Sequence, residues 1–485
     1  MINEIKINNK YLYFRRTKII ATLGPASTNE KILKKFISNN LNIFRINFSH
    51  SDAKEHLQTI ELIRRISNEL KKSPAILADL CGPKIRVGKF KNGFITLKNN
   101  SSIYLTTNDV IGDDNIIPVN YKNLIKEIKI NERILLNDGA LELKVIKKYK
   151  DKIEVKVIRG GILKDKKGLN LPETKLKISA LTEKDKQDVL HCINAGVDFI
   201  ALSFVRSAND VLELKNLLKE HNSDIPVIAK IEKPEAVTNI EEIIKVSDGI
   251  MIARGDLGVE MPIQKVPIIQ NKIIKLTNQY SKPVIVATQM LESMIENSAP
   301  TRAEVTDVFA ASLSDVDAVM LSGETAVGKF PFETFKMMDT ILRESEAYQF
   351  FSFGGKFKKS GTIKKNELQN ALAIATAQLS RDLLVKAIFV LTRSGNSARF
   401  VSADRPAAPI FALTQSDKVL RRLNLLWGVI PILINKEIKF KDYVLYSEKI
   451  IKDLKLAKKD DFILLLSGLI DKNELTNSIV VHQIK

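Results

Sequence analysis

The sequence predicts an α/β protein built on a (β/α)8 TIM barrel, with a small β-barrel domain inserted into it and an α/β domain after it. From residue 17 onward, eight short apolar runs alternate with amphipathic segments, which is typical of repeated β-α units. About a hundred residues with a different hydrophobic pattern separate the third run from the fourth. Since eight β-α units are the number that closes such a barrel, we expect one barrel with a single large insertion.

Each of the eight runs is six or seven residues long and mostly aliphatic, as expected of strands buried on both faces of a parallel sheet. The predicted strands are 18–24, 42–48, 75–80, 198–204, 226–232, 248–254, 283–289 and 317–323. Between many of these strands, apolar residues recur with the period of a helix. The pattern is clear in 30–39, 54–70, 183–194, 208–219 and 265–279.

The interruption consists of short alternating runs such as FITL and KIEVKVI, with the turn signals NDG and RGG between them. This pattern predicts a small β domain, which we expect to cap the barrel mouth. After the eighth unit, a Gly- and Lys-rich linker (352–367) leads to a helix and three strands, 386–392, 409–414 and 461–468, which indicate a regulatory or assembly domain. The predicted domains are the barrel in two parts (1–82 and 181–350), the insertion (83–180) and the C-terminal domain (351–485).

Composition excludes several classes of protein. The 485 residues are 45% hydrophobic and 27% charged, as in soluble globular proteins. The net charge of +19 is scattered and no recognition motif accompanies it, so we predict no nucleic-acid role, and an anionic substrate explains part of the charge equally well. The segment MINEIKINNKYLYFRR lacks the apolar core of a signal peptide, and no apolar stretch is long enough to span a bilayer, so we expect neither export by that route nor membrane insertion. Its two cysteines, Cys81 and Cys192, are too few for a disulfide framework, so we expect a cytoplasmic protein.

Charged residues lie at the ends of two neighbouring predicted strands. Lys230 and Glu232 end the strand 226–232, and Arg254 and Asp256 lie at the end of the strand 248–254. The carboxyl ends of parallel strands form the edge where ligands bind. Lys230 and Glu232 are two residues apart and therefore share a strand face. Two carboxylates from adjacent strands can hold one Mg²⁺ or Mn²⁺, and the cationic groups suit an anionic, phosphorylated substrate. The alternative is a salt bridge between Glu232 and Arg254.

The other strand ends at the same edge are also polar, whereas the opposite ends carry nothing reactive, which favours an enzyme over a binding barrel. These residues are Arg45, Asn47, Ser49, His50, Asp79, Ser203, Arg206, Thr288, Gln289, Ser322 and Glu324. In addition, Gly255 and Gly258 follow the strand 248–254, where free backbone N–H groups could face a phosphate or carboxylate, or the glycines could simply make the turn.

A second candidate phosphate site lies in the C-terminal domain, in the loop TRSGNSAR between a strand and a helix. It offers the hydroxyls of Thr392, Ser394 and Ser397 and the backbone of Gly395. An ordinary helix cap would explain the same residues.

The runs FRINFSH, ADLCGPKIR, IPVIAKIEKPEAV, MIARGDLGVE, VIVATQMLESM, PTRAEVTDV and VMLSGETAVG together resemble the pyruvate kinase family in order and spacing, over about residues 17–485. The resemblance implies a glycolytic phosphotransferase (EC 2.7.1.40) that moves the phosphoryl group of phosphoenolpyruvate to ADP and yields pyruvate and ATP. It also implies an allosteric C-terminal domain and a homotetramer.

Carried over residue by residue, the resemblance implies that Glu232 and Asp256 hold Mg²⁺ or Mn²⁺ and that Lys230 neutralises the phosphoryl group in transfer. Arg45 and Arg86 would contact phosphates, and Thr288 and Ser322 would lie on the path of the proton to the enolate. The remaining implied contacts are Gly255, Asp256 and Thr288 with the substrate carboxylate, and Asn47, His50 and Arg86 with the nucleotide.

One position departs from the commoner family pattern. Many members bind K⁺ through positions that match Asn47, Ser49, Asp79 and the Leu80 carbonyl, and carry a Glu where this chain has Lys84. The sequence resembles the potassium-independent subgroup, because the Lys84 ammonium can supply the charge that K⁺ would bring. We therefore expect that K⁺ is not required.

The resemblance leaves regulation and two other functions open. The loop 467–477 lacks the Arg and Trp of some bisphosphate-activated members, so we expect a sugar monophosphate or a nucleotide as effector rather than fructose 1,6-bisphosphate. Another metal-dependent barrel acting on phosphoenolpyruvate or pyruvate, such as an aldolase, would need neither nucleotide nor cap. A sensor without turnover would be expected to lack Lys230 or a metal carboxylate, and both are present.

Overall fold

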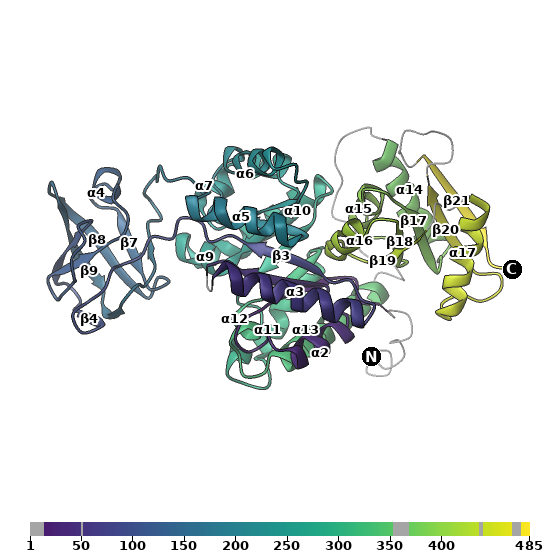
Figure 1. Cartoon of the computed structure of the whole chain (residues 1–485), viewed down its shortest axis with the longest axis horizontal. Coiled ribbons are helices and arrows are strands. Elements are labelled where there is room, and N and C mark those ends of the chain that lie inside the picture. Colours follow the sequence, from purple (N-terminus) through teal and green to yellow (C-terminus); the bar gives the residue numbers. More distant parts are fainter. Residues whose placement is uncertain (1–13, 50–51, 353–367, 436–439, 468–476) are drawn as a thin grey trace.

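The computed structural model describes residues 14–49, 52–352, 368–435, 440–467 and 477–485. Its centre is a closed barrel of eight parallel strands in the order β1-β16-β15-β14-β13-β12-β3-β2 (Figure 1). The strands are β1 (Lys18–Thr22), β2 (Ile43–Asn47), β3 (Ala75–Asp79), β12 (Phe199–Leu202), β13 (Val227–Ile231), β14 (Gly249–Ala253), β15 (Val284–Ala287) and β16 (Ala318–Leu321). Each lies within its predicted range, so the predicted barrel is confirmed.

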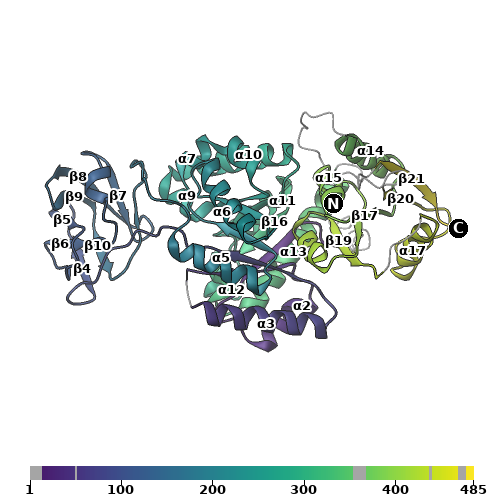
Figure 2. The same ribbon diagram turned by 45° about the horizontal axis from the view of Figure 1, so that its top comes forward.

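Helices surround the barrel (Figure 2). The five predicted helices are confirmed as α2 (Glu30–Ser38), α3 (Ala53–Glu69), α5 (Glu183–Ala195), α6 (Ala208–Glu220) and α10 (Val266–Gln279). The structure adds α7 (Pro234–Thr238), α8 (Ile240–Val246), α9 (Arg254–Glu260), α11 (Arg302–Leu313), α12 (Gly323–Ala326) and α13 (Pro331–Ser352), with short 3-10 turns η1 (Ile263–Lys265) and η2 (Glu292–Ile295). Capping boxes, such as Thr182 with Asp185, set where α5 and α11 begin.

Alternation along the strands decides which side chains enter the barrel. In β13, Val227, Ala229 and Ile231 pack outward against the helices, whereas Ile228 joins a separate cluster inside the barrel. The same interior cluster contains Ile20, Ile43, Leu77, Phe199, Met251, Ile285 and Met320. Side chains two residues apart on a strand share a face, so the residues two positions after Ile43, Leu77 and Ile228 also point into the barrel. They are Arg45, Asp79 and Lys230, and they lie nearest the carboxyl ends of their strands.

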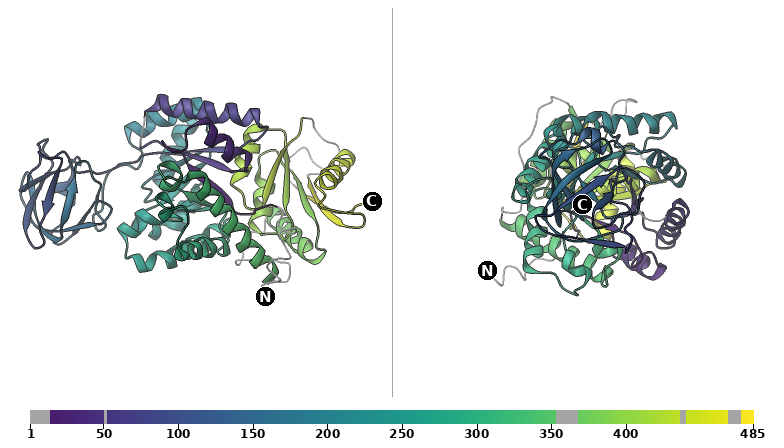
Figure 3. Two further views of the ribbon diagram at one scale, coloured as in Figure 1. Left: turned by 90° about the horizontal axis from the view of Figure 1, so that it is seen from below. Right: turned by 90° about the vertical axis from the view of Figure 1, so that its left-hand side faces the viewer.

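The insertion is an all-β domain around a single core that is separate from the barrel core. Six strands form one sheet in the order β11-β7-β8-β9-β5-β6, and two form a second, β10-β4. The elements are β4 (Phe94–Leu97), β5 (Ser102–Thr106), β6 (Ile116–Pro118), α4 (Leu124–Glu127), β7 (Arg133–Leu136), β8 (Leu141–Lys148), β9 (Lys152–Arg159), β10 (Gly161–Lys164) and β11 (Leu169–Asn170). Two extended segments join it to the barrel, one after β3 and one before α5 (Figure 3).

The C-terminal domain is a five-stranded sheet in the order β19-β18-β17-β20-β21, in which β21 alone is antiparallel to its neighbour. The elements are α14 (Leu368–Asp382), β17 (Ala387–Leu391), α15 (Asn396–Ala403), β18 (Ile410–Thr414), α16 (Asp417–Arg422), η3 (Leu423–Leu425), β19 (Val429–Leu433), α17 (Phe440–Asp453), β20 (Phe462–Ser467) and β21 (Ser478–Gln483). The three predicted strands are β17, β18 and β20. The predicted linker lies outside the described residues, apart from Ser352 at the end of α13.

The C-terminal domain closes the end of the barrel where the strands begin. Lys18 Nζ, at the start of β1, donates to the Val429 carbonyl at 2.6 Å. Arg405 Nη1 lies 2.9 Å from Asp317, just before β16, and Leu425 joins the interior cluster of the barrel. The carboxyl ends of the strands therefore face the inserted domain. In the part of the chain that the structure describes, we find no helix long and apolar enough to cross a membrane.

Candidate active site

Four charged side chains meet at the carboxyl ends of β2, β3 and β13. Arg45 donates to Asp79 Oδ2 from Nε at 2.7 Å, and its Nη2 lies 2.6 Å from the same oxygen. Lys230 Nζ lies 3.2 Å from Asp79 Oδ1 and 2.8 Å from Glu232 Oε1. The strand alternation that turns Lys230 inward thus brings it to an aspartate about 150 residues earlier in the chain.

The mutual contacts keep these buried groups charged. Burial alone would lower the pKa of Lys230, but the negative charges of Asp79 and Glu232 outweigh it and raise the pKa above its ordinary value. Burial would raise the pKa of Asp79, yet Lys230 and Arg45 hold it below its ordinary value. Lys230 is only 8% exposed, so the mouth contains a fixed ammonium with little competing water.

The loop after β12 orients both Lys230 and Glu232. Ser203 Oγ accepts a hydrogen bond from Lys230 Nζ at 2.7 Å and donates to the Leu80 carbonyl at 2.7 Å. The backbone N–H of Phe204 donates to Glu232 Oε2 at 2.9 Å, with Phe204 at a φ of 57°. A positive φ at an aromatic residue is strained, and such strain persists where surrounding contacts hold the backbone, often at functional sites.

Gly255 and Thr288 form a second part of the mouth. Thr288 Oγ1 accepts from the Gly255 N–H at 2.7 Å and donates to the Ala287 carbonyl at 2.6 Å. A side chain on Gly255 would place its Cβ 3.3 Å from Thr288 Oγ1, so the glycine permits this close approach. Thr288, with a φ of 67°, and Gln289, with a φ of 53°, are strained in the same way as Phe204.

The structure fits a divalent cation between Glu232 and Asp256. The two carboxylates follow the adjacent strands β13 and β14, and Asp256 reaches solvent in the mouth. Burial and the negative charge of Glu232 raise the pKa of Asp256 to about 6. Within the described ranges no group of three or more His, Cys, Asp or Glu could hold a metal ion. Substrate oxygens and water would have to complete the coordination.

Arg254 is held away from these carboxylates. Its Nη1 donates to Asp307 at 2.7 Å, and its Nη2 donates to the carbonyls of Thr288 and Gln289 at 2.9 Å each. The alternative of a Glu232–Arg254 salt bridge is therefore wrong, because Glu232 pairs with Lys230 instead. Arg254 supports the strained turn after β15.

Ser322 lies at the end of β16. Its N–H donates to Glu324 Oε2 at 2.6 Å, while its buried hydroxyl has no hydrogen-bond partner among the described residues. The other Glu324 oxygen accepts from the Leu291 N–H at 3.2 Å, so this buried carboxylate has a structural role. The Ser322 hydroxyl stays available for water or a ligand.

The residues proposed for a monovalent cation end or follow the neighbouring strands β2 and β3, where Asn47 is paired with Asp79. Lys84 Nζ donates to Ser49 Oγ at 3.0 Å, and the Ser49 N–H donates to Asn47 Oδ1 at 3.1 Å. The Ser203 hydroxyl, already bonded to Leu80, lies 3.3 Å from Asp79 Oδ1. Lys84 thus places its charge beside Ser49, just after β2.

The predicted nucleotide contact Arg86 is not part of this cluster. Arg86 belongs to the inserted domain, where its Nη1 donates to the Lys166 carbonyl at 3.0 Å. His50 lies outside the described residues. In the C-terminal domain, Thr392 Oγ1 accepts from the Gly395 N–H at 2.9 Å, Gly395 has a φ of 90° before α15, and Ser394 is exposed.

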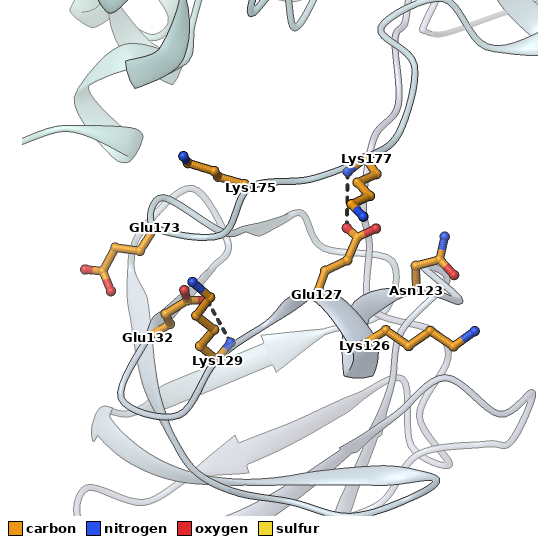
Figure 4. A pocket seen from close by; sticks show the side chains of 8 residues that line it. All are labelled: Asn123, Lys126, Glu127, Lys129, Glu132, Glu173, Lys175 and Lys177. Carbon is orange, nitrogen blue, oxygen red and sulfur yellow. Dashed lines mark hydrogen bonds between the residues drawn. The ribbon is translucent and has the colours of Figure 1, made fainter.

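A pocket of about 510 Å³ in the inserted domain gives no competing site (Figure 4). Its lining residues are Asn123, Lys126, Glu127, Lys129, Glu132, Glu173, Lys175 and Lys177. Glu127 accepts from Tyr121 at 2.5 Å and from the Lys177 N–H at 3.3 Å, and Glu132 accepts from the Lys129 N–H at 3.0 Å. The side chains drawn do not converge on one point, and these two carboxylates brace the loops instead.

Sequence reasoning missed one buried group beside the site. Lys233 Nζ lies 2.5 Å from Glu260 Oε1 at the end of α9, and Asn170 of the inserted domain donates to the same oxygen at 2.8 Å. Lys233 directly follows Glu232, so this contact ties the insertion to the neighbour of a proposed metal ligand. The position of Lys233 directly after Glu232 was the available signal, but its partners come from distant segments.

The fold and its mouth define the class: a (β/α)8-barrel enzyme with a buried, charged site under an inserted β domain. Family models described as "Pyruvate kinase, barrel domain" and "Pyruvate kinase, alpha/beta domain" match residues 14–335 and 370–482. The chain belongs to the pyruvate kinase family of glycolytic kinases.

Curated relatives agree over nearly the whole chain. The chain is 42% identical to a pyruvate kinase of Thermococcus litoralis over 472 residues, which cover 97% of this chain and 98% of the relative. It is also 42% identical to the pyruvate kinase of Thermotoga maritima over 97% of this chain and all of the relative. A pyruvate kinase of Clostridium perfringens is 42% identical over 94% of this chain and 96% of the relative.

Proposed function

We propose that this chain transfers the phosphoryl group of phosphoenolpyruvate to ADP with Mg²⁺ or Mn²⁺ and without a requirement for K⁺. The observation that carries the proposal is the protonated Lys230 ammonium between Asp79 and Glu232 at the carboxyl ends of the strands. Phosphoryl transfer requires positioned positive charge more than covalent chemistry, and this is what the cluster offers.

Lys230 and Arg45 supply the positive charge that the protein itself contributes. Lys230 would meet the phosphoryl oxygens as charge builds up during transfer, and Arg45 would bind the same phosphate. Arg45 is fixed by Asp79 and by Thr22 Oγ1, 3.0 Å from Nη1, so little reorganisation is needed when substrate arrives.

Glu232 and Asp256 would hold the divalent cation. When bound, that cation would supply positive charge that stabilises the anionic substrate during transfer. The Phe204 N–H and Lys230 keep Glu232 in one orientation. Gly255 and Thr288, with Asp256, would bind the substrate carboxylate, which the close Gly255–Thr288 contact supports.

For the proton that converts enolpyruvate to pyruvate, we propose a water path past Thr288 Oγ1 and Ser322 Oγ. The unpartnered Ser322 hydroxyl supports this path. Asn47, His50 and Arg86 are proposed nucleotide contacts. Family membership supports a homotetramer, and two free thiols support a cytoplasmic location.

We propose that Lys84 replaces the monovalent cation. Its ammonium lies 3.0 Å from Ser49 Oγ, among the groups that would otherwise coordinate K⁺. A lysine side chain delivers one positive charge as a point, as K⁺ does, but without an exchange step.

One assay tests the reaction and its cation requirement. We expect the full chain, with phosphoenolpyruvate, ADP and MgCl2 in a tetramethylammonium buffer free of K⁺ and Na⁺, to form ATP in a coupled assay, with no strong stimulation by KCl. Failure to form ATP with or without KCl contradicts the proposed function. If the wild-type protein forms ATP slowly without KCl and much faster with it, only the proposed role of Lys84 is contradicted.

The matched variant is Lys84→Glu. It removes the internal cation and restores the acid of the commoner pattern, so we expect it to be slow without K⁺ and to recover when KCl is added. A Lys84→Glu variant that is equally active with and without KCl would also contradict this role.

We propose that Thr392, Ser394, Gly395 and Ser397 bind an effector phosphate of a sugar monophosphate or nucleotide. The exposed Ser394 and the left-handed Gly395 at the start of α15 support this proposal. At low phosphoenolpyruvate, we expect glucose 6-phosphate, ribose 5-phosphate or AMP to raise the initial rate. Activation by fructose 1,6-bisphosphate alone would contradict this proposal.

A further inference from the structure

The loop after β12, residues 203–207, contacts both segments that join the inserted domain to the barrel. The outgoing segment passes over it at Gly82, which has a φ of 65°. A Cβ at Gly82 would lie 2.6 Å from Phe204 Cδ2 and 3.2 Å from Ser203 Cβ. The backbone of the outgoing segment therefore rests directly on this β12 loop, at a distance that only glycine permits.

The returning segment is held to the same loop by Arg206. Its Nη1 donates to the Leu176 carbonyl at 2.5 Å, and its Nη2 donates to the Ile178 carbonyl. The side chain is 19% exposed. Two charge-assisted bonds from one planar guanidinium fix both the position and the direction of a backbone segment.

Arg206 is itself fixed from the barrel side. Its N–H donates to Asp210 Oδ2 at 2.9 Å in the first turn of α6, and its carbonyl accepts from Asn239 Nδ2 at 2.9 Å. Arg206 therefore connects the returning segment to a rigid part of the barrel rather than to a free loop.

The opposite side of the β12 loop orients the proposed metal and phosphate groups. Two residues before Arg206, the Phe204 N–H donates to Glu232 Oε2, and Ser203 Oγ accepts from Lys230 Nζ. Because Phe204 is in a strained conformation, this N–H points at Glu232 only while its surroundings hold the backbone. The contacts that hold it include Gly82 and Arg206.

We propose that Arg206 is a positioning residue, which ties the inserted domain to the metal-binding carboxylate Glu232 through the backbone of Phe204. The proposal rests on the function proposed above, in which Glu232 binds the divalent cation. Without the two bonds to Leu176 and Ile178, the β12 loop would lose its connection to the returning segment, and the Phe204 N–H that orients Glu232 would be held less firmly.

The test is Mn²⁺ binding to the full chain without substrates, followed by electron paramagnetic resonance of the free ion. Groups that orient a metal ligand typically affect metal affinity by 10- to 100-fold, so we expect Arg206→Met to raise the dissociation constant by about tenfold. The Arg206→Lys side chain can reach one carbonyl at most, so its dissociation constant for Mn²⁺ should lie between those of Arg206→Met and wild type. In steady-state kinetics, the KM for ADP should rise more than that for phosphoenolpyruvate, because the inserted domain carries Arg86.

Arg64→Met is the matched control. Arg64 Nη1 donates to the Pro74 carbonyl at 3.1 Å, and Nη2 donates to the Gly196 carbonyl at 3.2 Å and to Asp198 at 2.7 Å, at the opposite end of the barrel. A merely structural role for Arg206 would lower the melting temperature in both variants and leave Mn²⁺ affinity unchanged in both. That result, or an equal loss of affinity in Arg64→Met, overturns the proposal.

Two further outcomes are decisive. If Arg206→Met does not fold, Arg206→Lys is compared with Arg64→Lys, and an unchanged Mn²⁺ affinity in Arg206→Lys overturns the proposal. If wild type binds Mn²⁺ but forms no ATP, the proposed function fails, while the Mn²⁺ comparison still decides the role of Arg206.

Discussion

Lys230→Met should lower kcat by about 10² to 10³, because removal of one well-placed donor to the charge of a transition state typically costs that much. The KM for phosphoenolpyruvate should change less than kcat, since the ammonium acts mainly on the charge that develops during transfer. The measurement is the coupled ADP-to-ATP assay with and without Mg²⁺. A variant within a few-fold of wild type would exclude the assigned role.

The same substitution has a structural cost that must be measured separately. Asp79 and Glu232 are 0% and 1% exposed, and each loses one charged partner when Lys230 is replaced. Breaking a buried pair in this way costs about 3 to 5 kcal/mol of the free energy of unfolding. Thermal unfolding therefore accompanies the kinetics, with Lys34→Met as the surface control, because an exposed pair such as Lys34–Glu30 contributes little to stability.

Glu232→Gln and Asp256→Asn should each abolish divalent-cation binding in the usable concentration range. Since even the groups that orient a ligand affect affinity by about 10- to 100-fold, removal of a ligand should cost at least about 100-fold. Wild type stripped with EDTA should lose activity and regain it with MgCl2, and neither variant should regain it. Mn²⁺ titrations measure the loss without turnover.

Glu235→Gln is the control for this pair. Glu235 lies three residues beyond Glu232 on α7, is half-buried, and is not part of the charged cluster. We expect unchanged Mn²⁺ affinity. If Glu232→Gln or Asp256→Asn bound Mn²⁺ as tightly as Glu235→Gln does, the carboxylate in question would not be a metal ligand.

Strands and helices of the barrel could be predicted because their signals are local. Buried parallel strands are continuous apolar runs, and the intervening helices repeat with a 3.6-residue period. The same signals fail at the edges of the C-terminal sheet. β19 is an apolar run, but it contains Pro431, which argues against a strand within a sheet, and β21 is antiparallel and largely accessible.

The candidate site could be predicted only as a set of residues at one edge. Inward-facing positions follow from alternation, which is why Lys230 and Glu232 could be paired from sequence. No catalytic role for Arg254 follows from the sequence, but its partner Asp307 could not be identified because it lies 53 residues further on. Arg86 looked equivalent to Arg45, yet the structure directs its guanidinium to Lys166.

By itself, the sequence determined the eight-unit barrel, the place of the insertion and the residue types at the strand ends, because these depend on neighbours in the chain. Only the tertiary structure decided which charges meet. Closing the barrel sets β12 between β3 and β13, so Asp79 reaches Lys230 across a hundred-residue insertion. It also decided the strained turn at Phe204, which no local preference favours and which long-range contacts hold in place.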